Sequence, residues 1–97
     1  MINVNEYIEL VLKKKKWTRA KLVEEINKIE EKLGNVRTSK QNITNYLNGT
    51  HEIRPKWLVK VEAALGLPTY TLINMVEFPV TKEGQRELKE IIKKVRG

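Results

Sequence analysis

Residues 38–49 have the sequence Thr38-Ser39-Lys40-Gln41-Asn42-Ile43-Thr44-Asn45-Tyr46-Leu47-Asn48-Gly49, which is typical of a short helix with one apolar and one polar face. Thr38 or Ser39 can accept hydrogen bonds from the free N–H groups of the first turn, and Gly49 can take the left-handed conformation that ends a helix. Ile43 and Leu47 are one turn apart and face the core, with Tyr46 beside them. The outward side chains are those of Lys40, Gln41, Asn42, Thr44, Asn45 and Asn48.

These outward side chains favour a polar partner. Gln and Asn each carry a donor and an acceptor on one planar group, which matches the paired N6 and N7 of adenine in the DNA major groove. On a short helix the same residues are often no more than its solvated face. The choice between these two interpretations depends on the charge of the chain.

The charge of the chain favours a polyanionic partner such as nucleic acid. There are 19 Lys and Arg against 12 Asp and Glu, a net charge of +7 over 97 residues. Residues 35–60 hold a surplus of four positive charges, and Lys13–Lys16 form a second concentration. Four lysines at the end of a helix are explained by the helix dipole, by a phosphate contact, or by both.

Apolar residues recur at helical spacing through most of the remaining chain, most clearly as Leu22, Ile26, Ile29 and Leu33. Two helices are predicted before residues 38–49, one from Asn3 or Asn5 to Lys13–Lys16 and one from Thr18 to Gly34. Two are predicted after them, from Pro55 to Gly66 and from Pro68 or Thr69 to Val76. A last helix is predicted from Thr81 onward, with the apolar stripe Leu88, Ile91, Ile92 and Val95. Residues 77–80 are expected to form a linker or a short edge strand, because Pro79 disfavours a helix there. The sequence therefore predicts an all-α fold, with one domain over 1–76 and a linker and amphipathic helix over 77–97.

The composition argues against several kinds of chemistry. The chain has no Cys and one His, so disulfides, thiolate metal sites and an ordinary zinc site are not expected. His51 is expected in an exposed loop, and beside Glu52 it makes no catalytic pair. Trp57 is in phase with Val61, which favours a core position over a stacking platform. We expect no enzyme activity and no cofactor.

The chain lacks an apolar run of membrane-spanning length and an export signal, so a cytoplasmic protein without membrane contact is expected.

Three motifs follow one another between about residues 5 and 76. They are Thr18 to Leu22, then Ser39-x-x-x-Ile43-x-x-Tyr46-Leu47-Asn48-Gly49, then Pro55-x-x-Leu58-x-x-Val61-x-x-x-Leu65-Gly66-Leu67-Pro68. This order resembles the helix-turn-helix domain of phage lambda repressor-like regulators. The resemblance implies a five-helix domain that sets its third helix into the major groove. The base contacts that it implies are Lys40, Gln41, Asn42, Thr44 and Asn45. The phosphate contacts expected with it are Arg37, Ser39, Asn48, Thr50, Arg54 and Lys56.

The second helix departs from this family pattern. Residues 28–37 look like an insertion of about ten residues, so the second helix must be longer than in most of the family. The extra turns either change the angle between the second and third helices or project outward and leave the third helix in place.

The sequence thus predicts a sequence-specific double-stranded DNA-binding protein, a transcriptional regulator of the repressor type found on phages and mobile elements. One short helix contacts few base pairs, so a homodimer on an inverted repeat is expected, joined through Phe78 or the Leu88–Val95 stripe. The alternative is a protein-interaction module, antitoxin-like or an adaptor, that uses the C-terminal helix to hold a protein.

Overall fold

Capping residues set where the helices begin in the computed structural model, which describes residues 2–76 and 81–96. Asn3 accepts a hydrogen bond from Glu6 N at the start of α1 (Val4–Lys15), and Thr18 accepts from Lys21 N at the start of α2 (Arg19–Leu33). Ser39 does the same for α3 (Lys40–Leu47). Pro55 occupies the first position of α4 (Pro55–Ala64), where its missing N–H costs nothing.

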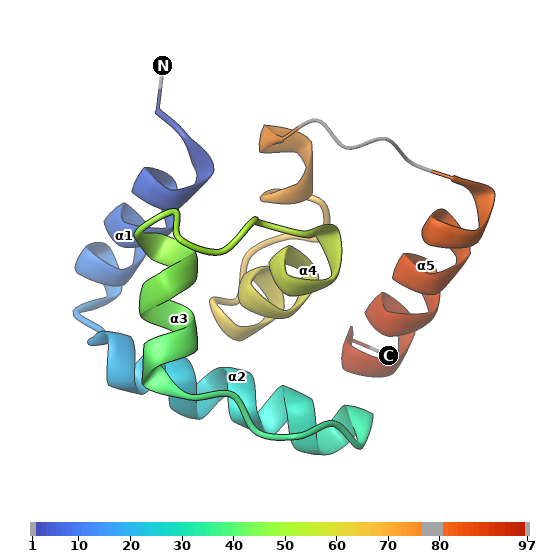
Figure 1. Cartoon of the computed structure of the whole chain (residues 1–97), viewed down its shortest axis with the longest axis horizontal. Coiled ribbons are helices and arrows are strands. Elements are labelled where there is room, and N and C mark those ends of the chain that lie inside the picture. The colour runs from blue at the N-terminus through green and yellow to red at the C-terminus, as the bar shows by residue number, and fades with distance from the viewer. Residues whose placement is uncertain (1, 77–80, 97) are drawn as a thin grey trace.

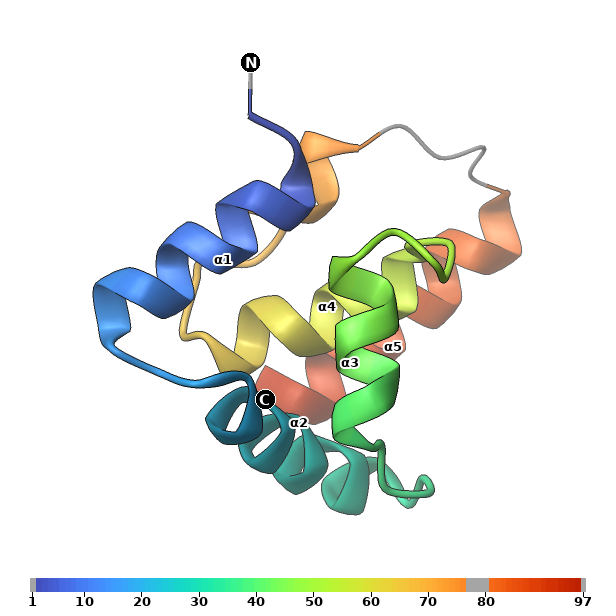
Figure 2. The same ribbon diagram turned by 60° about the vertical axis from the view of Figure 1, so that its left-hand side comes forward.

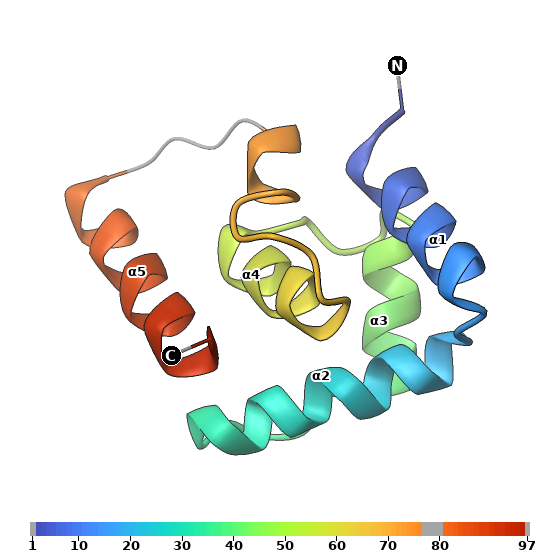
Figure 3. The ribbon, with the colours of Figure 1, turned by 180° about the vertical axis from the view of Figure 1, so that it is seen from behind.

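The described residues form an all-α structure without strands, as predicted (Figure 1). α4 lies in the middle, and Figure 3 shows α2 running past the ends of the other helices on one side. The largest fully buried side chains are Ile8, Leu22, Ile26, Ile43, Leu58, Leu65 and Leu72. Each such side chain stabilises the fold by about 1.5–3 kcal/mol relative to an exposed position. Trp57, 8% exposed, belongs to this core, as its phase with Val61 predicts.

The long second helix is held to the start of α3 by one buried side chain. Asn27, 4% exposed, accepts from Thr38 N at 2.7 Å and donates to Thr38 O at 3.1 Å. The extra turns of α2 therefore extend past α3. The chain then returns along α2 to Thr38, which the hydrogen bonds to Asn27 hold in place one residue before the cap Ser39. The longer helix does not displace α3 from the core, because Ile43 is 0% exposed.

The prediction of a fifth helix from Pro68 or Thr69 to Val76 is wrong. This segment forms turns and a short 3-10 helix, η1 (Ile73–Met75), and Tyr70 has a φ of +71°. Glu62, fully buried on α4, holds this segment, because its carboxylate accepts from Tyr70 N at 2.9 Å and from Leu72 N at 3.0 Å. The left-handed conformation of Tyr70 between these contacts interrupts a helical backbone, so no regular helix forms here.

The last helix, α5 (Lys82–Arg96), packs back on the domain against α4 and α2, one of the two arrangements expected from the sequence. Thr81 Oγ1 accepts from Gly84 N at 3.0 Å and caps it. Lys32 Nζ donates to Val95 O at 3.2 Å, and Arg96 donates to Leu67 O at 2.6 Å. The linker or strand expected over residues 77–80 lies outside the described residues.

The apolar stripe of α5 is half-buried, and no residue of this helix is fully buried. Leu88 and Ile91 border hollows that they share with residues of α4 and α2. The stripe therefore faces its own chain. One prediction was that it joins two copies of the chain in a dimer, but it is not presented as a free surface for that contact. Phe78, the other candidate for a dimer contact, lies outside the described residues.

Within residues 2–76 and 81–96, no helix is long and apolar enough to cross a bilayer.

Candidate nucleic-acid interface

The outer face of α3 is open to solvent. Figure 2 shows α3 in front of α4, with no other segment of the ribbon covering it. Lys40, Gln41 and Asn42, in the first turn, are exposed, whereas Thr44 and Asn45 are half-buried. All five predicted base-contacting residues therefore lie on one short helix, and the three at its N-terminal end are the most accessible.

Both ends of α3 are fixed by local hydrogen bonds. Ser39 Oγ accepts from Asn42 N at 3.1 Å, which makes Ser39 and not Thr38 the cap and leaves its O–H as a donor. Gly49 has a φ of +81°, the left-handed conformation predicted for the end of the helix. The N–H groups of Thr50 and His51 both donate to Asn45 O, at 2.9 and 3.1 Å, and hold the following loop against the helix.

Several predicted phosphate contacts surround one hollow beside α3. Its volume is about 360 Å³, and it lies between the loop after α2, the outer side of α3 and the start of α4. Four cationic side chains line it: Arg37, Arg54, Lys56 and Lys60. Asn42, a predicted base contact, borders the same hollow. The structure thus brings Arg37, Arg54 and Lys56 together with the first turn of α3.

Three of these four cations have carboxylate partners in the same chain. Lys56 pairs with Glu87 of α5 at 2.8 Å, Arg37 with Glu31 at 3.2 Å, and Lys60 with Glu30 at 2.9 Å. The Lys60 pair is nearly buried, and the other two are exposed. Arg54 has no ion pair with any residue that the structure describes. Exposed pairs are weak, so Arg37 and Lys56 can exchange a carboxylate for another anion at little cost.

Other predicted phosphate contacts lie apart from this hollow. Asn48 and Gly49 border a larger hollow of about 830 Å³, whose remaining lining comes mostly from α1. Thr50 is exposed in the loop after α3. The predicted phosphate contacts therefore do not share one site. Arg37, Arg54 and Lys56 line the hollow beside α3, and Asn48 lines the hollow beside α1. Ser39 and Thr50 are exposed and line neither.

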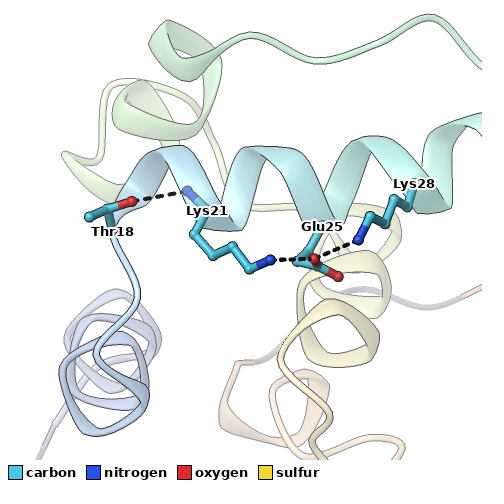
Figure 4. A network of polar contacts seen from close by, with 4 residues as sticks. All are labelled: Thr18, Lys21, Glu25 and Lys28. Carbon is cyan, nitrogen blue, oxygen red and sulfur yellow. Dashed lines mark hydrogen bonds and ion pairs between the residues drawn. The ribbon is translucent and has the colours of Figure 1, made fainter.

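The polar face of α2 differs from that of α3, because it carries ion pairs within the helix (Figure 4). Glu25 Oε1 accepts from Lys21 Nζ and from Lys28 Nζ, both at 2.9 Å. The hydrogen bonds from Lys28 and Lys21 lower the pKa of Glu25, and the hydrogen bond to Glu25 raises the pKa of Lys21. Around Glu25 this face has the pairs three and four residues apart that its alternating charges suggest.

His51 belongs to the α3 face although the sequence analysis did not select it. Its Nε2 lies 3.4 Å from Asn45 Nδ2, and Gln41 Nε2 donates to Asn45 Oδ1 at 2.9 Å. A separation of four residues predicts that Gln41 and Asn45 are neighbours. No local pattern places a loop histidine beside them, because the contact depends on how the chain turns after Gly49.

The described residues contain no group of three or more His, Cys, Asp or Glu side chains placed to hold a metal ion. Comparison of the chain with protein-family models, with curated proteins and with solved structures found no significant match.

Proposed function

We propose that this chain is a sequence-specific double-stranded DNA-binding module and acts as a transcriptional regulator. In this proposal α2 and α3 serve as a helix-turn-helix of the phage lambda repressor-like kind, with α3 in the major groove. The observation that supports it most is the position of the amide side chains of α3, which face solvent beside a hollow lined by cationic side chains. Amides suit base edges, and cations suit phosphates.

The proposal divides the work between two sets of side chains. Arg37, Arg54 and Lys56 neutralise phosphates and fix the register of the protein on the duplex. Gln41 and Asn42 discriminate between bases. No chemical step is involved, and neither a metal ion nor a cofactor is required.

A symmetric dimer on an inverted repeat remains part of the proposal, because a helix of eight residues contacts few base pairs. We do not propose the apolar stripe of α5 as its contact surface, since α5 packs against α2 and α4 of the same chain and the stripe is half-buried.

The protein-interaction alternative has less support. An adaptor that captured a protein with α5 would need the apolar side of that helix free. Hydrogen bonds from Lys32 to Val95 and from Arg96 to Leu67, with packing against α4 and α2, hold α5 on its own domain instead.

A salt titration of binding to random-sequence duplex tests the proposal. For a DNA-binding protein the affinity falls with salt, with a logarithmic slope of about −0.9 for each phosphate neutralised. Arg54→Ala should reduce that slope by about one and weaken binding to all sequences alike. Lys28→Ala is a control of equal charge, because Lys28 pairs with Glu25 on α2 and does not line the hollow. Binding that is absent at low salt, or weakened equally by both variants, would count against the proposal.

A further inference from the structure

Three polar side chains form a hydrogen-bonded series along the outer face of α3 and the loop after it. Gln41 Nε2 donates to Asn45 Oδ1 at 2.9 Å, and Asn45 Nδ2 lies 3.4 Å from His51 Nε2. An amide nitrogen only donates, so this contact is a hydrogen bond when His51 Nε2 accepts and the ring proton sits on Nδ1. Each member of the series thereby fixes the orientation of the one before it.

The series is anchored to the core through aromatic rings. The ring of His51 meets Tyr46 edge-on, with centroids 5.3 Å apart and an interplanar angle of 70°. Tyr46 in turn stacks on Trp57 at 4.4 Å and 18°, and Trp57 is buried. Two backbone hydrogen bonds, from Thr50 N and His51 N to Asn45 O, hold the same loop. His51 is therefore a loop residue with a defined position.

The orientation of Gln41 has a consequence for what it can bind. With one Nε2–H directed to Asn45, the carboxamide keeps Oε1 as an acceptor and one N–H as a donor. These two groups match the N6 amino group and the N7 acceptor of adenine in the major groove. We infer that Gln41 is the residue that selects an adenine, and that Asn45 and His51 are positioning residues that hold its amide ready for this contact.

This inference rests on the proposed function and changes one assignment within it. Asn45 was expected to contact a base directly, but its Oδ1 and one of its N–H groups are engaged within the protein. Ordering a long side chain such as Gln on binding costs free energy, and holding it in place beforehand reduces that cost. The gain should appear as stronger preference for adenine and not as stronger binding to every sequence.

The experiment uses the full chain and a duplex recovered from a random pool by selection with the wild-type protein. The base pair contacted by Gln41 is the one whose preference disappears in Gln41→Ala. At this pair, 7-deazaadenine, which lacks the N7 acceptor, should bind the wild type about tenfold or more weakly than adenine does. The same replacement should make no difference to Gln41→Ala.

Two substitutions of His51 separate the acceptor nitrogen from the packing of the ring. His51→Phe keeps a ring against Tyr46 but has no acceptor, and we expect its adenine preference to fall about two- to tenfold. His51→Gln supplies an acceptor oxygen and should retain most of the preference. In the Gln41→Ala background His51→Phe should have no further effect on this base pair, since the coupling passes through Gln41. Wild-type preference in His51→Phe, or an equal loss in His51→Gln, would overturn the inference.

A measurement without DNA keeps this test separate from the proposed function. Side-chain NH₂ signals of Gln41 and Asn45 in the free protein should report restricted amides in the wild type and averaged ones in His51→Phe. If the wild type binds no duplex, the proposed function fails, while the NMR comparison still decides whether the series exists. If duplex binding is normal but the amide signals do not respond to His51→Phe, only the inference fails.

Discussion

α3 and α5 are both amphipathic helices on the outside of the molecule, but they relate to the core in opposite ways. The apolar side of α3 is closed off, with Ile43 at 0% and Leu47 at 8% exposure, while α5 has no buried residue. Their outer faces differ too, since the outer face of α3 carries mostly amides whereas that of α5 carries Lys and Glu. Spacing predicts a helix in both cases. Spacing does not predict how deeply the apolar side chains of a helix are buried, because that depends on the other elements that pack against the helix.

The largest expected effect comes from the apolar anchors of these two helices. Ile43→Ala should lower the free energy of unfolding by about 2–5 kcal/mol, because it leaves a cavity in a closed core. Ile91→Ala on α5 should cost less than about 1.5 kcal/mol, because its side chain is half-exposed and solvent fills the space. Denaturant unfolding followed by circular dichroism gives both values. Equal losses would show that α5 is as much a part of the core as α3.

The next effect concerns how each helix is held in place. Asn27→Ala should cost about 1–3 kcal/mol, because it leaves the half-buried N–H and C=O of Thr38 without their side-chain partner at the start of α3. The comparable contact of α5, between Lys56 and Glu87, is exposed, and Glu87→Gln should change stability little.

Hydrogen exchange distinguishes a local from a global cause of this loss. In Asn27→Ala, the first-turn amides of α3 should exchange faster than those in the middle of α4. Uniform acceleration in both helices would mean that Asn27 supports the whole fold and not the start of α3 in particular.

Asn27 and Glu62 also mark the limit of what the sequence could predict. Caps, turns and apolar spacing are local signals, and they placed the starts of α1, α2, α3 and α5 correctly. Both buried side chains bond to backbone groups eight or more residues away. Such contacts produce no periodic pattern in the sequence. The short fifth helix was therefore predicted where Glu62 instead holds a turn.

The candidate site was predictable to a similar extent. The polar face of α3 followed from spacing, and the cationic residues of the loop and α4 followed from the charge distribution. Three features depend on three-dimensional arrangement. They are the separation of Asn48 from the hollow beside α3, the carboxylate partners of Arg37 and Lys56, and the contact of His51 with Asn45. Local sequence carries no information on these pairings.

The third expected effect compares the outer faces in binding. Gln41→Ala should lose roughly 1–3 kcal/mol of discrimination at one base pair and leave the affinity for random duplex nearly unchanged. Lys89→Ala on the exposed side of α5 should leave the discrimination unchanged, because that side does not border the hollow beside α3. Competition binding with selected and random duplexes measures both. Equal losses on both kinds of duplex for Gln41→Ala would remove it from the base-contacting set.

The smallest effect uses the polar face of α2, where Glu25 pairs with Lys21 and Lys28, in contrast to the amide-rich face of α3. Two lysine partners lower the pKa of Glu25, so its ionised form stabilises the folded state. That contribution is complete above the ordinary glutamate pKa and is lost as the pH falls through the lowered one. The raised pKa of Lys21 adds a contribution that is present below the ordinary lysine pKa and is lost as the pH rises through the raised one. The wild type should therefore melt slightly above Glu25→Gln at neutral pH, and the two should converge in acid.

The control for this comparison is Glu24→Gln, which removes one carboxylate from the same helix. Glu24 is exposed and makes no hydrogen bond to a lysine that the structure describes, so the melting temperature of this variant should follow that of the wild type more closely at every pH. A difference between wild type and Glu25→Gln that persists unchanged in acid would mean that Glu25 acts through packing. In that case the ion pairs of Glu25 would not be what sets the face of α2 apart from that of α3.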